Sequence, residues 1–407
     1  MTSTEHPIHP ETLALHGGSF RADPATGAVA VPIYQTTSYQ FHDTGHAERM
    51  FSLREVGFTY TRTGNPTRDA AERRLAALEG GAGSLIVASG TAARLYSLVN
   101  LAQAGDNLVV AANVFEASEL KINLARHGID VRFVDPGDPT NFRNATDSST
   151  RAYFGETLGL ADLRLFPIAE VAAIGRKQGI PLIVDNSALP VQIRPLDQGA
   201  AVVVYATPAY LSGHGITEAG ALIDGGTFPW ADHAKRCPLL TEPDDSYHGA
   251  VWTDVAAWFK VPLAYLIRAR MRVLRDFGGA VSPFDVFQLI QGLETLPLRM
   301  RAHAEGARAI ATYLSGRDDV ESVLYPKLAG DDVRSGLVKF RHRGGRDAAL
   351  KILAAFRLIR RGDGFGETRS VADLGRDPAN ASITLSVGIE HPEDLIADLE
   401  QALDTGA

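Results

Sequence analysis

Short runs of apolar residues recur between residues 84 and 223, and each is separated from the next by an amphipathic stretch of helical length. The runs are rich in Val, Ile and Leu without polar alternation, which is typical of strands buried on both faces of a parallel sheet. They lie at residues 85–88, 108–111, 131–134, 152–154, 180–184 and 201–204. The pattern predicts an α/β fold with a mainly parallel central sheet covered by helices.

Capping signals flank these runs. Asn65 precedes Pro66, and an N-cap residue followed by proline is suited to the start of a helix. Gly179 comes directly before the run at 180–184, where a glycine is suited to end a helix. These capping residues therefore support alternating strands and helices in this part of the chain.

The pattern changes at both ends of this region, and 407 residues exceed the ~250 to 300 that one core supports. Residues 1–64 have scattered Gly and Pro with little periodicity, which predicts an N-terminal arm that packs on a partner subunit. Residues 65–262 form the predicted large α/β domain. Beyond them the pattern is helical over 265–277 and 283–314 and then mixed, which predicts a smaller α+β domain at 263–407.

Charge and composition exclude several classes of partner. The chain has 40 Lys and Arg against 48 Asp and Glu, a net charge of −8, without a long basic run. Nucleic acids and acidic membranes attract basic patches, so we expect neither as a partner. One cysteine, no window of about 18 apolar residues and no secretory signal predict a cytoplasmic protein.

A metal site is not expected. His42 and His46 have a His-x-x-x-His spacing, but Gly45 lies between them and no glutamate follows His42. Solvated histidines of the arm are the better interpretation.

Three candidate site residues follow predicted strands. Gly90 and Thr91 come after the run at 85–88 and open a predicted helix, whose free N–H groups suit a phosphate, although small residues there also serve tight packing. Asp185 ends the run at 180–184 and so lies at the carboxyl edge of the sheet, where ligands of open α/β folds bind. It could hold a pyridinium N–H, or it could cap the next helix.

Three further side chains are candidates for the same ligand. Phe115 could stack on a flat ring, although an aromatic residue near a strand end is more often part of the core. Tyr60 and Arg62 offer a hydroxyl and a guanidinium suited to a phosphate, with an ordinary surface arginine as the plain alternative.

The order of these segments resembles the pyridoxal-phosphate (PLP) enzymes of cysteine and methionine metabolism, a fold type I, aspartate-aminotransferase-like family. The resemblance runs from His16 through the segment PIYQTTSY at 32–39 to LSVGIE at 385–390. Other segments look like the O-acetylhomoserine sulfhydrylases of trans-sulfuration and methionine biosynthesis. They are GTFPW at 226–230, LTEPDDSYHG at 240–249, LRDF at 274–277 with SPF at 282–284, and QGLETL at 291–296.

The resemblance assigns a role to each candidate residue. It implies that Gly90 and Thr91 bind the cofactor phosphate, and that Asp185 pairs with the pyridinium nitrogen. Phe115 stands where the family has a stacking tyrosine. Tyr60 and Arg62 would reach the phosphate from a neighbouring subunit of a homo-oligomer, which the family predicts to be a homotetramer, and Tyr60 is also a candidate for moving a substrate proton.

The chain departs from the family pattern at the residue that should matter most. In the segment YATPAYLSGHG at 205–215, Ala209 stands where the family has the lysine that binds the cofactor covalently. Ala206 and Pro208 replace two phosphate-binding hydroxyl residues of the family. Any PLP is therefore expected to bind non-covalently.

The substrate side departs as well. Leu160 stands where the family shows an asparagine, and Thr384 where an arginine would hold the substrate's α-carboxylate. Nearby arginines could substitute, although an exposed charged face is the simpler interpretation; they are Arg357, Arg360, Arg361 and Arg369. So many joint changes favour natural divergence over a single engineered alanine, although an engineered alanine in a divergent member stays open.

Two functions remain as hypotheses. The first is an O-acetylhomoserine sulfhydrylase-like enzyme that acts on an amino-acid substrate by γ-elimination or γ-replacement in a remodelled site. The second is a catalytically impaired or redirected paralogue that serves as a binding or assembly partner. Because the lysine is missing, the sequence alone predicts neither the substrate nor whether the chain is an active enzyme.

Overall fold

A computed structural model describes residues 8–18, 20–206, 209–326, 335–374 and 381–406. Two sheets form its frame: seven strands in the order β1-β7-β6-β5-β4-β2-β3, and five in the order β10-β11-β12-β9-β8. The strands of the larger sheet are β1 (Gly83–Val87), β2 (Asn107–Ala111), β3 (Asp130–Val134), β4 (Thr150–Glu156), β5 (Leu182–Asp185), β6 (Val202–Tyr205) and β7 (Gly220–Asp224). Those of the smaller sheet are β8 (Val320–Leu324), β9 (Leu337–His342), β10 (Arg360–Arg361), β11 (Val371–Asp373) and β12 (Ser382–Ser386).

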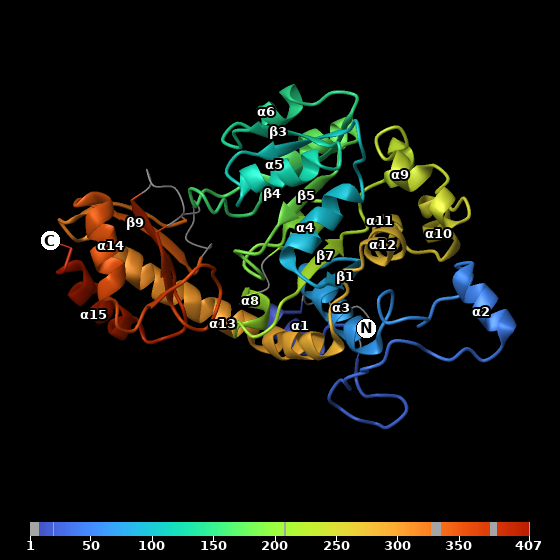
Figure 1. The fold of residues 1–407 in the computed structure, drawn as a ribbon, viewed down its shortest axis with the longest axis horizontal. Helices are drawn as coiled ribbons and strands as arrows, with labels where there is room; N and C mark the ends of the chain where they lie inside the picture. Colours follow the sequence, from blue (N-terminus) through green and yellow to red (C-terminus); the bar gives the residue numbers. More distant parts are fainter. Residues whose placement is uncertain (1–7, 19, 207–208, 327–334, 375–380, 407) are drawn as a thin grey trace.

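Helices precede, separate and follow these strands (Figure 1). In the first part of the described chain they are α1 (Pro10–His16), α2 (Thr44–Phe51), α3 (Pro66–Glu79), α4 (Gly90–Val99), α5 (Ala117–Ala125), α6 (Thr140–Asn144), α7 (Ile168–Gln178) and α8 (Ala209–Ser212). In the second part they are α9 (Pro238–Thr241), α10 (Trp252–Trp258), α11 (Ala264–Arg268), α12 (Arg275–Phe277), α13 (Pro283–Ser315), α14 (Gly345–Ala355) and α15 (Pro392–Leu403).

The larger sheet is mainly parallel, which confirms the predicted α/β class. β7 runs antiparallel to β1 and to β6, while the other neighbouring strands are parallel. The carboxyl ends of β1, β2, β4, β5 and β6 therefore meet at one edge, where ligands of such folds bind.

Both faces of this sheet are buried, as the unbroken apolar runs predict. In β1, Leu85 and Val87 belong to one core cluster, while Ile86, on the opposite face, belongs to another. Helices α4 and α7 contribute to the first cluster, and α3 and the first half of α13 to the second. Most strand residues are thus removed from water, whichever face they point to, whereas the edge strand β3 is only partly buried.

The predicted caps are confirmed. The Asn65 side chain accepts a 3.0 Å hydrogen bond from the Thr67 N–H, and Pro66 is the first residue of α3. Gly179 ends α7 in the left-handed conformation with φ of 71°, which costs a glycine nothing.

The long helix α13 connects the two sheets. Its first half, with Val286 and Leu293, packs in a core of the larger sheet, and its second half, with Ile310 and Leu314, packs against the smaller one. Its 33 residues extend about 50 Å, enough to span both cores. Figure 1 shows it running from beneath the larger sheet towards α14 and α15.

The predicted domain boundary after residue 262 stays a prediction. Residues that follow it still pack in the core of the larger sheet. Tyr265 of α11 and Leu274, which follows it, are buried in the core of the larger sheet. Because the change of core occurs inside α13, we propose that the large domain extends into that helix.

The N-terminal arm contains two short helices among irregular segments. Helix α1 contacts α3 and α13, whereas α2 lies at the far side of the molecule (Figure 1). Large apolar side chains on and around this arm are exposed, among them Val29, Phe51 and Val56. In the described ranges, no helix combines the length and the apolar character needed to cross a bilayer.

Candidate functional site

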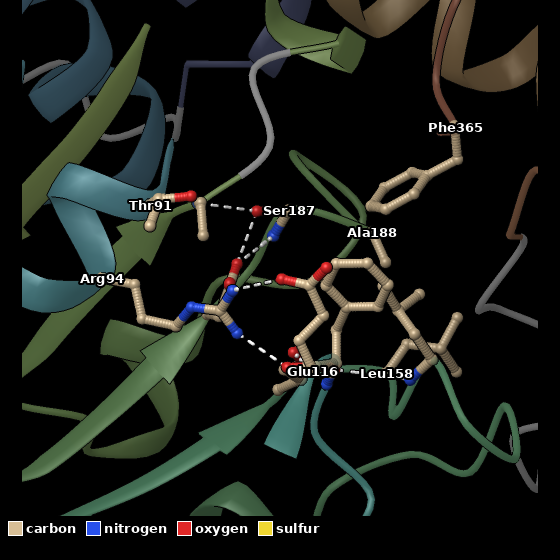
Figure 2. A pocket seen from close by; sticks show the side chains of 12 residues that line it. Thr91, Arg94, Glu116, Leu158, Ser187, Ala188 and Phe365 are labelled. Carbon is tan, nitrogen blue, oxygen red and sulfur yellow. Dashed lines mark hydrogen bonds and ion pairs between the residues drawn. The ribbon is translucent and has the colours of Figure 1, made fainter. Parts of the chain in front are cut away.

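A pocket lies at the carboxyl edge of the larger sheet, where the sequence predicted a ligand (Figure 2). Its volume is about 450 Å³. It is lined by Thr91, Arg94, Phe115, Glu116, Glu156, Leu158, Leu160, Asp185, Ser187, Ala188, Ala206 and Phe365. Three of the predicted cofactor residues, Thr91, Phe115 and Asp185, are therefore brought together.

Asp185 ends β5, and its carboxyl group is buried in the pocket. The N–H and the hydroxyl of Ser187 both donate to its Oδ1, at 2.9 and 2.5 Å. Burial raises the pKa of Asp185, although these hydrogen bonds oppose the rise. These bonds fix the orientation of the carboxyl group at the end of β5.

Glu156, which was not predicted as a site residue, ends β4 directly beside Asp185. Its carboxyl group accepts hydrogen bonds from the N–H groups of Phe115 at 2.7 Å and Leu160 at 3.4 Å. Burial and then the neighbouring Asp185 raise the pKa of Glu156. Its place at the end of a neighbouring parallel strand was the signal that could have identified it.

The first turn of α4 faces the same edge. The Ser89 side chain caps it by accepting from the Ala92 N–H, and the Gly90 and Thr91 N–H groups have no helical acceptor before them. A Cβ on Gly90 would lie 1.5 Å from the carbonyl oxygen of Ala206, so only glycine permits this close approach of helix and strand. Gly90 is thus at the predicted place, with a packing role as well.

Arg94 is the second site residue that sequence reasoning missed. It lies one helical turn after Thr91, and it is the only cation among the described lining residues. Its guanidinium donates to the Phe115 carbonyl oxygen at 2.7 Å and lies 3.8 Å from the Glu116 carboxylate (Figure 2). Phe115, partly exposed, keeps its ring at the pocket.

Ala206 lines the pocket, and Ala209 begins helix α8 three residues later. Ala209 is half-buried and does not line the pocket, and Pro208 lies outside the described residues. Arg299 of α13 fixes α8 by donating to the Tyr210 carbonyl oxygen at 2.7 Å. None of the described lining residues is a lysine.

Tyr60 and Arg62 do not line the pocket of their own chain. They lie on the arm, where the Arg62 guanidinium is 5.3 Å from the centre of the Tyr60 ring. The Nε of Arg62 is buried without a hydrogen-bond partner among the described residues. Their predicted approach from a neighbouring subunit stays a prediction.

The side of the pocket away from Asp185 is apolar. Leu158, Leu160 and Ala188 come from the larger domain, and Phe365 comes from the C-terminal part of the chain. Thr384 is on β12, opposite Lys339 of β9. The arginines suggested as substitutes at positions 357, 360, 361 and 369 do not line the pocket, and all four are exposed.

Comparison with known proteins identifies the relatives of this chain. The sequence model of the family described as "Cys/Met metabolism PLP-dependent enzyme" matches residues 11–404. An O-acetyl-L-homoserine sulfhydrylase of Leptospira meyeri is 39% identical, over 97% of this chain and 96% of the relative. A homocysteine synthase of Schizosaccharomyces pombe is 37% identical, over 97% and 98% respectively.

The fold has a close counterpart in a crystal structure described as an O-acetylhomoserine (thiol)-lyase of Campylobacter jejuni with a pyridoxyl-lysine monophosphate. The TM-score is 0.91, with 33% sequence identity, covering 98% of this chain and all of the other. The family match, these relatives and the fold agree with the geometry of the pocket. The chain belongs to the family of Cys/Met metabolism PLP-dependent enzymes.

Proposed function

We propose that this chain holds PLP without a covalent bond, and that it is a redirected member of its family without ordinary sulfhydrylase turnover. One observation carries the proposal: the pocket keeps Asp185 and the first turn of α4, yet no lysine is among its described lining residues. Binding groups for the cofactor are thus retained without the covalent attachment.

The residues present fit PLP held in this way. The Asp185 carboxyl group would accept from the pyridinium N–H, and its buried position strengthens that contact. The N–H groups of Gly90 and Thr91 would bind the phosphate at the positive end of α4. Phe115 would pack on the ring.

Proton transfer is the step for which the chain lacks the family's lysine. When bound, PLP supplies an electron sink for a substrate amine. A lysine at position 209 would move protons beside that sink, and alanine has no ionisable group. General acid–base catalysis by a positioned side chain contributes about 10²- to 10⁴-fold to rates. We therefore expect turnover to be lower by at least that factor than in a family member with the lysine.

A second function is favoured by the identity of 39% to an O-acetyl-L-homoserine sulfhydrylase. In this alternative the chain acts on an amino-acid substrate by γ-elimination or γ-replacement, with Tyr60 of a neighbouring subunit moving the proton. Formation of homocysteine from O-acetylhomoserine and sulfide at rates typical of enzymes, about 1 to 10³ s⁻¹, would support this alternative over our proposal.

An absorbance titration with PLP tests cofactor binding. We expect a saturable change in ring absorbance, removal of the cofactor on extended dialysis, and no cofactor attached to the protein after borohydride reduction. An absence of saturable binding would contradict the proposal, as would cofactor fixed to the wild-type chain by reduction.

The variant Ala209→Lys tests the position of the missing lysine. We expect it to form a borohydride-reducible bond with PLP, seen as an added phosphopyridoxyl mass on the peptide that contains residue 209. Ala231→Lys, on an exposed turn, is the matched control and should gain no such bond. If PLP binds to Ala209→Lys but is not fixed by reduction, position 209 is not where the family has its lysine.

A further inference from the structure

The pocket has two halves of different chemistry, and Figure 2 shows them on opposite sides. Thr91, Arg94 and Ser187 lie on one side, whereas Phe365, Ala188 and Leu158 lie on the other. We propose that the apolar half receives the hydrocarbon body of a primary amine without a carboxylate, and not an α-amino acid. This inference rests on the proposed function, because PLP would occupy the polar half.

The apolar half is a packed wall. Leu158 is fully buried in a cluster with Leu163, Leu189 and Leu337, and both Leu160 and Phe365 pack against this cluster. Leu337 belongs to β9, so the wall joins the two parts of the molecule. Burying a leucine-sized group against such a surface is favourable, by about 25 cal/mol for each Å² removed from water.

Lys339 holds the wall in place. Its Nζ donates to the carbonyl oxygens of Leu160 at 3.2 Å and Ala161 at 2.8 Å. A lysine from the C-terminal sheet thereby fixes the loop that carries Leu160. Because this ammonium group is occupied by two carbonyls and does not line the pocket, it is not a free partner for a substrate carboxylate.

The described lining of the pocket offers a substrate carboxylate no free cationic partner. That lining includes three carboxyl groups, of Glu116, Glu156 and Asp185, against the single guanidinium of Arg94. That guanidinium is already engaged by the Phe115 carbonyl oxygen and by Glu116. A substrate carboxylate would lose its water here without gaining a bidentate partner, which is unfavourable.

A primary amine has no such cost. It has no carboxylate that needs a cationic partner, and its nitrogen would lie towards the polar half of the pocket, where PLP, when bound, would supply a carbonyl carbon that reacts with amines. The packed wall of Leu158, Leu160 and Phe365 suits a short alkyl chain of leucine size.

Two conjugates that differ only in a carboxylate test this preference. In one, 3-methylbutylamine is joined to PLP by a reduced carbon–nitrogen bond; in the other, leucine is joined in the same way. Calorimetric titration of the full-length protein with each conjugate gives their dissociation constants. A separate titration with PLP alone tests the cofactor site by itself.

We expect the amine conjugate to bind at least about tenfold more tightly than the leucine conjugate, which corresponds to about 1.4 kcal/mol. Equal affinities, or tighter binding of the leucine conjugate, would overturn the inference. Failure of both conjugates would also overturn it. The titration with PLP then shows whether only the substrate preference is wrong or whether cofactor binding fails too.

Thr384→Arg is a variant that should change the preference. Thr384 and Lys339 are opposite each other in an antiparallel pair, so their side chains lie on the same face of the sheet, towards the loop with Leu160. An arginine there should raise the affinity of the leucine conjugate several-fold and leave the amine conjugate unchanged. Thr312→Arg, exposed on α13, is the control and should change neither. An identical result for the two variants would count against the proposed orientation of the substrate.

Discussion

Glu156 and Asp185 are neighbours in register on parallel strands, and both carboxyl groups are buried in the pocket. Burial favours the neutral form of each, and two negative charges this close repel one another. Their hydrogen bonds come mainly from backbone N–H groups. These donors still have an acceptor oxygen when one of the two carboxyl groups is protonated. The pair therefore retains a proton at pH values where exposed carboxyl groups have lost theirs.

This pair predicts a pH dependence of stability. The pKa of Glu156 is raised to about 8 from an ordinary 4.5, so between these values the folded protein holds a proton that the unfolded chain releases. Its contribution to stability is present below about pH 4.5 and is lost as the pH rises through about 8. We predict that Glu156→Gln makes unfolding of the cofactor-free protein less pH-dependent, by up to about 1.4 kcal/mol per pH unit.

Urea denaturation at several pH values measures this effect. Glu79 and Asp224 are also buried acids with raised pKa values of about 7, so the informative quantity is the difference between variant and wild type. Glu119→Gln, exposed on α5, is the control. Equal pH slopes for Glu156→Gln and the wild type would show that Glu156 is ionised in the folded protein.

The residues of the site differ in how far sequence reveals them. Asp185 and Thr91 follow apolar runs, so their place at the sheet edge follows from the strand pattern alone. In the sequence, Arg94 cannot be distinguished from an ordinary helix residue. In the structure, its guanidinium is buried and donates to the Phe115 carbonyl oxygen. Glu156 gains its importance from its neighbour Asp185, 29 positions away in the chain and adjacent only in the sheet.

At the scale of elements, the loop after β4 depends on a strand of the other sheet. The loop carries Leu158 and Leu160 into the pocket, and Lys339 of β9 bonds to two of its carbonyl oxygens. The Leu158–Leu165 bridge closes the loop on itself. The shape of the apolar wall is therefore set jointly by a loop of the large domain and the sheet that follows it.

We predict that Lys339→Met loosens this loop. The methionine keeps most of the buried volume but removes both hydrogen bonds, which should lower the free energy of unfolding by about 1 to 3 kcal/mol. Amide hydrogen exchange of residues 159–164 should accelerate more than that of the strands. Lys351→Met, exposed on α14, provides the comparison and should stay within about 0.5 kcal/mol of the wild type. If the two variants behave alike, Lys339 does not hold the loop.

Strands and caps were readable from local pattern, because burial on both faces needs unbroken apolar residues and a helix end needs particular side chains. β7 was not among the predicted strands, so neither its presence nor its direction was foreseen. Its antiparallel direction follows from the packing between β1 and β6.

At the scale of the whole molecule, the N-terminal arm leaves large apolar side chains uncovered by the rest of its own chain. Val56 and Val29 are about four-fifths exposed, at 79% and 81%. Large exposed apolar groups mark interaction surfaces. These side chains agree with the predicted homo-oligomer, in which the arm packs on a second copy.

We predict that Arg62 acts across the boundary between subunits. If it reaches the phosphate of a neighbouring pocket, Arg62→Gln should weaken PLP binding by about tenfold or more, because a charge-assisted hydrogen bond is lost. Light scattering should give a mass that is a multiple of 43.6 kDa for both proteins. Arg126→Gln, exposed at the end of α5, is the control. A monomeric mass, or unchanged affinity for PLP in an intact oligomer, would contradict this role.

The sequence by itself determined the α/β class, six strands of the larger sheet, two helix caps and the edge at which the pocket lies, because these depend on short-range patterns of burial and backbone conformation. It also showed alanine at positions 206 and 209. Only the tertiary structure decided which side chains share the pocket. Three of these features bring together residues that are distant in the chain. They are the proximity of Glu156 to Asp185, the burial of Arg94 and the contact of Lys339 with the Leu160 loop. Such contacts form only when the sheets and helices pack, and they determine the charge and shape that a ligand meets.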